Sequence, residues 1–351
     1  MNKIKLAVIF GGMSTEHDVS IVSGTSVIKN LNKEKYAIYP IYIDKEGIWY
    51  KYLKSTNKIE ALKVGDKITE IEEIENPIKY LKQMDCIFPV LHGLYGEDGT
   101  IQGLFELAQI PYVGCKVLAS SISMDKAYTK IIFEKAGLSQ APYAYIKANQ
   151  QKFYFIKKDF IEEQASLEKI SEKIEQKLTY PMFVKPSNSG SSVGISKVKT
   201  IEELKKAIIY ASKFDRKILI EQGIIGREVE CAVLGNEEVL ASCVGEVLSA
   251  EEFYSFDSKY KNQQSRTQIP ADLPENIAEE IRNNAIKAFK AVDGKGLARV
   301  DFFVEDKTNK VIINEINTLP GFTQISMYPK LFEESRISYS NLLDKIIELA
   351  M

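Results

Sequence analysis

Short apolar runs alternate with amphipathic stretches in the first third of the chain. Residues 3–10 and 85–91 are apolar runs of strand length, and each ends at a glycine-containing turn. Residues 100–108 follow the second turn as a helical stretch, and residues 111–114 add one more short strand. This order of strand, turn and helix predicts a βαβ unit with a parallel sheet that continues to about Ser121.

The remainder of the chain predicts further strands with helices beside them. Residues 180–186 and 195–198 read as strands that flank a loop of glycine and serine. Residues 228–234 and 239–247 read as an antiparallel pair. Residues 165–178 place leucine and isoleucine at helical spacing among charged residues, which predicts an amphipathic surface helix.

The clearest alternation of polar and apolar positions lies in residues 296–322, where two strand-like stretches flank a polar turn. Arg299 and Asp301 share one face of the first strand with Phe303. If the strands pair about the turn, Asp301 lies opposite Glu315 and Arg299 lies opposite Asn317, although a slip of one residue would reverse the faces. The same face of the second strand would then carry Val311, Ile313, Glu315 and Asn317.

This hairpin places two carboxylates, an amide and a fixed cation among apolar residues. Burying such groups without compensation is costly, so they should be paired or bound to a ligand. Hard oxygen ligands suit Mg²⁺ that bridges to phosphates. The alternative is a structural ladder of salt bridges.

Composition excludes several classes of partner. The 351 residues include 46 Lys and Arg against 48 Asp and Glu, a net charge of −2, which does not predict binding to nucleic acid or membrane surfaces. The four cysteines form no CxxC pair and predict reduced thiols in a cytosolic protein. No apolar run reaches the length of a signal-peptide core or of a membrane span.

Two turns after predicted strands carry further candidate chemistry. We expect a helix to start at Ser14 or Thr15, with Glu16 in its first turn, where it could bind a ligand or simply complement the helix dipole. The turn is not the GxGxxG of dinucleotide-binding proteins. His92 opens a loop with three glycines at a strand end, and it is either structural or part of a binding site.

Lys185 precedes the glycine and serine loop, residues 187–194. The loop is not a Walker A motif, because no GK[ST] leads into a helix. Small residues with free N–H groups can nevertheless cover phosphates, with Lys185 as a point charge. The alternative is a flexible hairpin loop beside a surface lysine.

Read together, these stretches resemble a known family. The chain contains, in order, GGMSTEHDVS, HGLYGEDGTIQG, VKPSNSGSSVGISKV and GLARVDFF…INEINTLPGF. Stretches similar to these occur in this order in D-alanine–D-alanine ligases, and the resemblance extends from Ile4 to the last predicted helix. It implies an α/β and α+β protein with an ATP-grasp fold and an N-terminal parallel-sheet, Rossmann-like domain. The implied domains are residues 1–121, 122–223 and 224–351, with ATP held between the last two.

The resemblance also implies roles for individual residues. Two Mg²⁺ (or Mn²⁺) ions would be held by Asp301, Glu315 and Asn317. ATP would be bound by Lys126, Lys185, Ser192, Glu221, Glu228, Lys259 and Asn314. The amino acids would be bound by Glu16, Val19, His92, Lys259, Tyr260, Arg299, Gly321, Ser326 and Met327. Catalytic roles would fall to Glu16, Ser191, Tyr260, Arg299, Gly321 and Ser326.

In such a reaction the first D-alanine is activated as an acyl phosphate, which the amine of the second D-alanine then attacks. Gln324-Ile325-Ser326 departs from the Ser-His-Ser of many members, which leaves the shape of the second subsite open. Met327 and Tyr260 favour D-alanine over D-serine and D-lactate there. A ligase for D-serine or D-lactate and a nucleotide-binding regulator without turnover are the alternatives. A cytoplasmic homodimer is expected from the resemblance.

Overall fold

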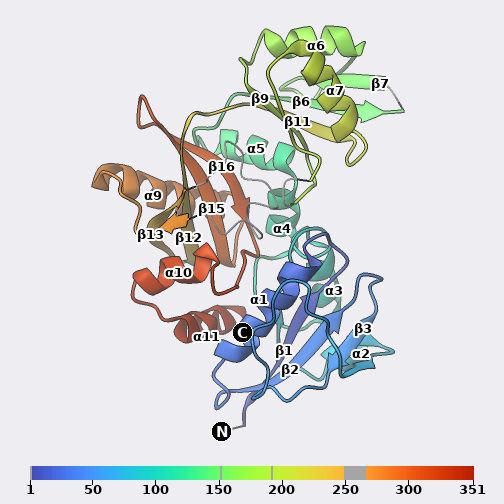
Figure 1. Cartoon of the computed structure of the whole chain (residues 1–351), viewed down its shortest axis with the longest axis vertical. Coiled ribbons are helices and arrows are strands. Elements are labelled where there is room, and N and C mark those ends of the chain that lie inside the picture. Colours follow the sequence, from blue (N-terminus) through green and yellow to red (C-terminus); the bar gives the residue numbers. More distant parts are fainter. Residues whose placement is uncertain (1, 151, 191–192, 249–265) are drawn as a thin grey trace.

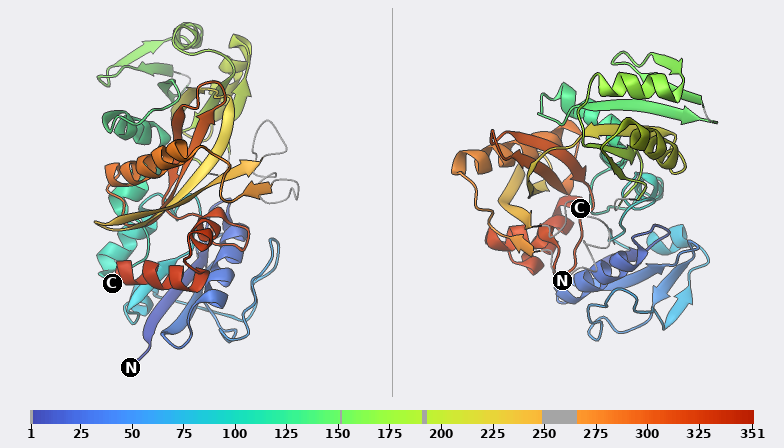
Figure 2. Two further views of the ribbon diagram at one scale, coloured as in Figure 1. Left: turned by 90° about the vertical axis from the view of Figure 1, so that its left-hand side faces the viewer. Right: turned by 45° about the horizontal axis from the view of Figure 1, so that its top comes forward.

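The computed structural model describes residues 2–150, 152–190, 193–248 and 266–351. These residues form three sheets of five, six and five strands. The first sheet, at one end of the long axis, and the second sheet, at the other, are separated by the third (Figure 1). The views of Figure 2 show the same separation of the first and second sheets.

The first sheet has the order β4-β3-β2-β1-β5 and is parallel only at its centre. β1 pairs in parallel with β2 and β5, whereas β3 and β4 are antiparallel additions at one edge. The predicted parallel βαβ unit is therefore confirmed for β1, β2 and β5. The strand predicted at 111–114 is reduced to a single bridge between Ile87 and Tyr112. The elements are β1 (Ile4–Gly11), α1 (His17–Asn30), β2 (Tyr36–Ile43), β3 (Trp49–Tyr52), β4 (Ile71–Glu73), α2 (Pro77–Leu81), β5 (Cys86–Pro89) and α3 (Thr100–Ala108).

Helix α1 begins one or two residues later than the sequence predicts. Glu16 is its N-cap residue, so the expectation of a Ser14 or Thr15 cap was wrong. The Ser14 hydroxyl instead accepts the Glu16 N–H at 3.1 Å and donates to the His92 carbonyl at 2.6 Å. The two glycine-containing loops of the first sheet are thereby tied together.

The second sheet is antiparallel in the order β10-β9-β11-β6-β7-β8. Two helices pack on it through fully buried side chains, including Ile170 and Ile174 of the predicted amphipathic helix, and Leu204 and Ile208. The elements are β6 (Tyr143–Asn149), β7 (Lys152–Ile156), β8 (Glu162–Ala165), α6 (Leu167–Glu175), β9 (Met182–Pro186), β10 (Ser196–Val198), α7 (Ile201–Ala211) and β11 (Lys217–Gln222). Two helices that precede it, α4 (Val117–Met124) and α5 (Lys126–Lys135), meet at Asp125.

The third sheet has the order β14-β13-β12-β15-β16, with every pairing antiparallel. It includes the predicted pair β12 and β13 and the predicted hairpin β15 and β16. The elements are β12 (Gly226–Gly235), β13 (Val239–Leu248), β14 (Arg266–Gln268), α9 (Glu275–Ala291), β15 (Gly296–Glu305), β16 (Val311–Asn317), α10 (Met327–Glu334) and α11 (Tyr339–Ala350).

The last helix packs against the first sheet rather than against its own neighbours alone. Leu342, Leu343, Ile346 and Ile347 of α11 are fully buried in the same cluster as Leu6 and Val8 of β1. Figure 1 shows α11 beside α1. The two ends of the chain thus share one hydrophobic core. Among the described helices, none is both long enough and apolar enough to cross a membrane.

Candidate active site

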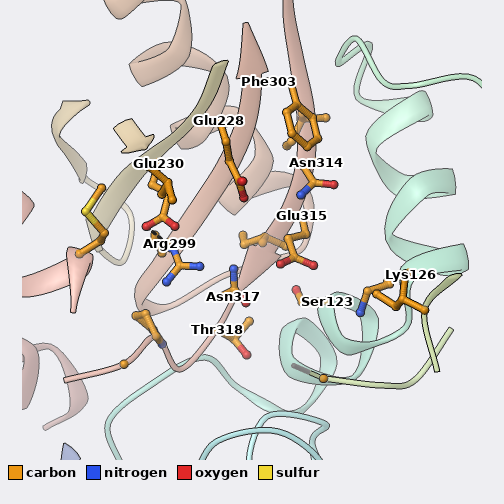
Figure 3. Close-up of a pocket in the computed structure, with 18 of the residues that line it drawn as sticks. Ser123, Lys126, Glu228, Glu230, Arg299, Phe303, Asn314, Glu315, Asn317 and Thr318 are labelled. Atoms are coloured by element: carbon orange, nitrogen blue, oxygen red, sulfur yellow. Dashed lines mark ion pairs between the residues drawn. The ribbon is translucent and has the colours of Figure 1, made fainter. Parts of the chain in front are cut away.

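A cavity of about 1010 Å³ opens between the second and third sheets and reaches the loops of the first. Figure 3 shows its walls, with Ser123 and Lys126 on one side and the strands of the third sheet on the other. Most of the residues predicted from the resemblance border it. Those in the lining are Glu16, His92, Lys126, Lys185, Glu221, Glu228, Arg299, Asn314, Glu315, Asn317, Gly321, Ser326 and Met327.

The register predicted for the hairpin is confirmed. Arg299 pairs with Asn317, and Asp301 pairs with Glu315. A bulge follows, because Phe302 pairs with Ile313 and leaves Asn314 as an extra residue. The prediction that Ile313 shares the face of Glu315 was therefore wrong, since Ile313 packs into the core with Phe302.

The bulge has a direct effect on the site. Consecutive residues of a regular strand point to opposite faces. Asn314 and Glu315 are consecutive, yet both border the cavity, as Figure 3 shows. One strand therefore supplies two adjacent polar side chains to the same wall.

Arg299 is held by two buried acids. Its Nε and Nη2 donate to the two oxygens of Asp301, each at 2.7 Å, and its Nε lies 3.0 Å from Glu230 Oε2. Burial alone would lower the pKa of Arg299, but Asp301 and Glu230 outweigh it and raise that pKa well above its usual value. The salt-bridge ladder considered as an alternative is thus present, and it forms one wall of the cavity.

The three residues predicted to hold metal lie together. Glu315 and Asn317 border the cavity, whereas Asp301 is 3% exposed and lies behind Arg299. The Asn317 amide nitrogen donates to Asp301 Oδ2 at 3.0 Å, which leaves its carbonyl oxygen as the atom that could bind a cation. Two carboxylates and an amide oxygen match the ligand preference of Mg²⁺ or Mn²⁺, so the donor set fits such an ion.

Opposite the acids, one glutamate holds two lysines. Glu221 of β11 lies 2.5 Å from Lys130 Nζ and 2.6 Å from Lys185 Nζ. Burial would raise the pKa of Glu221, but the two lysines outweigh it and lower the pKa to about 2. Burial likewise opposes the charge of Lys185, but Glu221 beside it raises the pKa of that lysine above its usual value. Lys185 is therefore a fixed cation in the cavity wall.

Lys126 and Ser123 flank the same wall from the α4–α5 junction. Lys126 Nζ donates to the Ser189 carbonyl at 2.7 Å. Burial lowers the pKa of Lys126, partly offset by Glu315. The buried Ser123 hydroxyl borders the cavity and has no hydrogen-bond partner among the described residues. This hydroxyl is therefore placed to hydrogen-bond a polar ligand or a water molecule in the cavity.

Glu16 lies between two glycines at the first-sheet end of the cavity. A Cβ on Gly93 would lie 2.5 Å from Glu16 Oε2, and one on Gly190 would lie 2.8 Å from it. Glu97 braces this loop, because its Oε1 accepts the Gly93 N–H at 2.8 Å. Burial first, and then the nearby Glu16, raise the pKa of Glu97 to about 8. The carboxylate of Glu16 is thus positioned by close backbone contact.

His92 is held from both sides of its ring. Nε2 lies 2.9 Å from Ser23 Oγ, and Nδ1 lies 3.2 Å from the Leu319 carbonyl. Burial lowers the pKa of His92, which favours the neutral ring. His92 therefore links α1 to the chain that leads into Gly321, in addition to bordering the cavity.

The remaining predicted residues divide into three groups. The Ser326 hydroxyl is 2.9 Å from the Thr323 N–H, and Met327 is buried beside the cavity. Val19 is 2% exposed and is not part of the cavity lining formed by the described residues. Outside the described residues lie Ser191, Ser192, Lys259 and Tyr260.

Sequence reasoning missed four residues of this site: Lys130, Glu230, Glu97 and Ser123. Spacing could have found two of them. Lys130 lies four residues after Lys126 and so shares its helix face, and Glu230 lies two residues after Glu228 and so shares its strand face. Glu97 stood within the loop opened by His92, where its burial was not visible from the sequence.

Family models match both parts of the chain. The model described as "D-ala D-ala ligase N-terminus" matches residues 5–115, and that described as "D-ala D-ala ligase C-terminus" matches residues 132–348. Together they cover most of the sequence and every described element of the cavity wall except the α4–α5 junction.

Similar proteins align over their full length. A protein of Acetivibrio thermocellus named "D-alanine--D-alanine ligase" is 52% identical over 100% of this chain and 96% of its own. One of the same name from Caldicellulosiruptor bescii is 50% identical over the same shares. The structure of a D-alanine-D-alanine ligase from Coxiella burnetii is 35% identical, with a TM-score of 0.82 over 100% of this chain and 94% of its own. The VanG D-Ala:D-Ser ligase of Enterococcus faecalis is 36% identical, with a TM-score of 0.85 over all of both chains.

Proposed function

The chain belongs to the D-alanine–D-alanine ligase family, and we propose that it joins two D-alanine molecules at the expense of ATP to form D-alanyl-D-alanine, a precursor of the cell wall. The observation that carries this proposal is the pairing of two charged walls across one cavity. Lys126 and Lys185 face it from the second-sheet side, and Glu315 with Asn317 face it from the third. Two walls of opposite charge suit a nucleoside triphosphate together with its metal ions.

The reaction proceeds in two steps. A carboxylate oxygen of the first D-alanine attacks the γ-phosphorus of ATP, and ADP leaves, which gives an acyl phosphate. The neutral amine of the second D-alanine then attacks the acyl carbon. The tetrahedral intermediate collapses with cleavage of the C–O bond to phosphate, and the nitrogen gives up one proton as the amide forms. Because little covalent chemistry falls to the protein, its contribution is positioning and charge stabilisation.

We assign the phosphate contacts to Lys126 and Lys185. Both are half-buried, and Lys185 is kept charged by Glu221. Glu221, which was expected to contact the nucleotide, borders the cavity, and that role stays a prediction. Its two oxygens also hold Lys130 and Lys185, so we further assign it to anchoring these lysines. Glu228 and Asn314 border the cavity and would contact the nucleotide.

We assign the binding of Mg²⁺ or Mn²⁺ to Asp301, Glu315 and Asn317. When bound, such ions neutralise charge on the phosphates during transfer. The protein's own part is to orient the ligands. Arg299 fixes Asp301 through both carboxylate oxygens, and Asp301 in turn fixes the Asn317 amide.

Glu16 would bind the ammonium of the first D-alanine, with His92 positioning the adjacent chain. Arg299 and the Gly321 N–H would stabilise the oxyanion of the second step. Ser326 and Met327 would contact the second D-alanine. For Ser191, Ser192, Lys259 and Tyr260, the roles given above stay predictions from the resemblance, as does the assignment of Val19.

A direct test is product analysis. The enzyme with ATP and Mg²⁺ should release ADP in the presence of D-alanine and form D-alanyl-D-alanine, identified by mass spectrometry. Parallel reactions that pair D-alanine with D-serine or D-lactate test the second subsite, since one similar structure is a D-Ala:D-Ser ligase. Mixed products formed as efficiently as the D-alanine dipeptide would overturn the substrate assignment. Absence of turnover with every pair would favour a regulatory nucleotide-binding protein.

Assembly and location are further parts of the proposal. We propose a homodimer, which sedimentation of the purified chain would test. We propose a cytoplasmic location because all four cysteines are free thiols. The division into residues 1–121, 122–223 and 224–351 also stays a prediction, and limited proteolysis would test it.

A further inference from the structure

A second charged network lies behind the lysine wall and is centred on Asp125, at the junction of α4 and α5. Asp125 is 6% exposed and caps α5 by accepting the Tyr128 N–H. A cap alone needs only one acceptor oxygen. Asp125 also forms an ion pair with Lys217 of β11 and accepts the Ser187 hydroxyl at 2.5 Å. These extra contacts join segments that lie about 60 and 90 residues away in sequence.

Ser187 is the link between the helix and the strands. It follows directly after β9 and is fully buried. Its hydroxyl also accepts the Ala127 N–H at 3.0 Å, and its carbonyl accepts the Lys126 N–H at 3.1 Å. Its own N–H donates to the Lys217 carbonyl at 2.9 Å. The hydroxyl and the carbonyl of Ser187 therefore hold the start of α5 against the end of β9, and its N–H ties the same point to β11.

The next residue is held in the same way by a second aspartate. Asp215 Oδ2 accepts two hydrogen bonds from Asn188, one from the backbone N–H at 2.9 Å and one from the side-chain amide nitrogen at 3.2 Å. Asp215 Oδ1 accepts the Lys217 N–H at 3.1 Å. The Asn188 amide also reaches Asp125 Oδ2 at 3.4 Å. Two aspartates thus fix the chain at 187–188 from two different elements.

This arrangement sets the position of the groups that face the cavity. Lys126 lies next to Asp125 in sequence, and its Nζ donates to the carbonyl of Ser189. Gly190, one residue further, lies in close contact with the Glu16 carboxylate. The path from Asp125 to Glu16 therefore runs through residues 187–190, all of them in direct contact. This path connects Lys126, which we assign to contact the phosphates of ATP, with Glu16, which we assign to bind the ammonium of the first D-alanine.

We propose that Asp125 is a positioning residue that holds Lys126 and residues 187–190 as one unit, so that the phosphate and the first D-alanine are kept in reacting geometry. This inference rests on the proposed function, because its consequence is a coupling of ATP use to peptide bond formation. A misplaced Lys126 or Gly190 would admit water to the acyl phosphate, which would then hydrolyse to D-alanine and phosphate.

The test is the variant Asp125→Asn. Asparagine still caps the helix but loses the charge that pairs with Lys217. We expect kcat to fall about tenfold or more and the KM for ATP to rise. We further expect the variant to release more than one ADP for each dipeptide formed, whereas we expect the wild type to release one ADP for each dipeptide. Lys217→Met removes the same ion pair from the other side and should shift the ratio in the same direction.

Asp159→Asn is the matched control, since Asp159 also accepts a backbone N–H but is exposed and lies outside this network. It should leave the ADP-to-dipeptide ratio and both KM values unchanged. If Asp125→Asn alters only the unfolding temperature and keeps the ratio at one to one, Asp125 is a structural residue and the inference is wrong. If the wild type makes no dipeptide, the proposed function fails first, so the two failures are distinct.

Discussion

Two clusters of three charged residues form part of the cavity walls, and each is the electrostatic reverse of the other. On the second-sheet side, one anion, Glu221, lies between two cations, Lys130 and Lys185. On the third-sheet side, one cation, Arg299, lies between two anions, Glu230 and Asp301. All six side chains are buried or nearly so. The described contacts thus place two cations on one anion in the first cluster and two anions on one cation in the second.

The difference shows how a site can remain charged without being unstable. Burying an uncompensated ion is expensive, whereas a partly compensated group costs much less. Each cluster compensates its central ion with two short ion pairs to residues of opposite charge. Lys126 adds to the positive side, and Glu315 adds to the negative side. A ligand with phosphates at one end and bound cations beside them would complete both clusters together.

The strongest test removes the acid that adds to the negative cluster. Glu315→Gln keeps the shape of the side chain but loses its charge, so metal-dependent turnover should fall about a thousandfold. ADP release would be measured over a range of Mg²⁺ concentrations. Glu305→Gln, at the far end of the same hairpin, should change the rate little. Undiminished D-alanine-dependent ATP hydrolysis in Glu315→Gln would contradict the metal assignment.

The central anion of the positive cluster should show itself in the pH dependence of stability. The pKa of Glu221 is lowered from 4.5 to about 2, so its ion pairs stabilise the fold above pH 4.5 and are lost as pH falls toward 2. Denaturant unfolding of wild type and Glu221→Gln at several pH values would measure this. The wild type should be the more stable at pH 7, and its advantage should shrink by about 3 kcal/mol as the solution is acidified to pH 2. An advantage that does not change with pH would show that Glu221 is not held ionised by its lysines.

The two lysines on Glu221 should differ, since only Lys185 borders the main cavity. Lys185→Met should lower kcat/KM for ATP about 100-fold, because a cation positioned for the transferred phosphate is lost. Steady-state kinetics at saturating D-alanine would measure it. Retention of normal kcat/KM would remove Lys185 from the phosphate site and leave the cluster as a structural feature.

Lys130→Met should give the smallest effect on catalysis. Its ammonium touches Glu221 from the side away from the main cavity, so the loss should lower the free energy of unfolding by about 2 kcal/mol. The kcat/KM for ATP should stay within about threefold of the wild type, because Lys185 still holds Glu221. Lys135→Met, at the exposed end of the same helix, is the control for stability. A large kinetic effect of Lys130→Met would mean that the two lysines act as one unit.

The cluster around Arg299 could be predicted from the sequence better than the cluster around Glu221. Alternation along two strands with a polar turn between them was enough to place Asp301 opposite Glu315 and Arg299 opposite Asn317, because strand pairing near a turn is local. The bulge at Asn314 could not be predicted, since it depends on packing of Ile313 with Phe302 in the core. The spacing from Glu228 marks the strand face of Glu230, but its contact with Arg299 could not be predicted, because it depends on the pairing of β12 with β15 across about 70 residues of intervening sequence.

The positive cluster shows the limits of local reasoning more clearly. Its members come from α5, β9 and β11, and only the tertiary fold brings Lys130, Lys185 and Glu221 together. The spacing of Lys126 and Lys130 marks one helix face but does not say what that face meets. The family resemblance supplied Lys185 and Glu221 individually. Their contact, and with it the anchoring role that we propose for Glu221, followed only from the three-dimensional arrangement.

The position of α11 has a consequence for whether the first sheet can fold by itself. Four of its core side chains complete the hydrophobic cluster that begins with Leu6 and Val8, more than 300 residues earlier. Contacts between residues so far apart in sequence form late, because a long loop must be closed before they can be made. A fragment that carries the first sheet without α11 would leave this apolar face in water, so we expect it to aggregate when it is expressed alone.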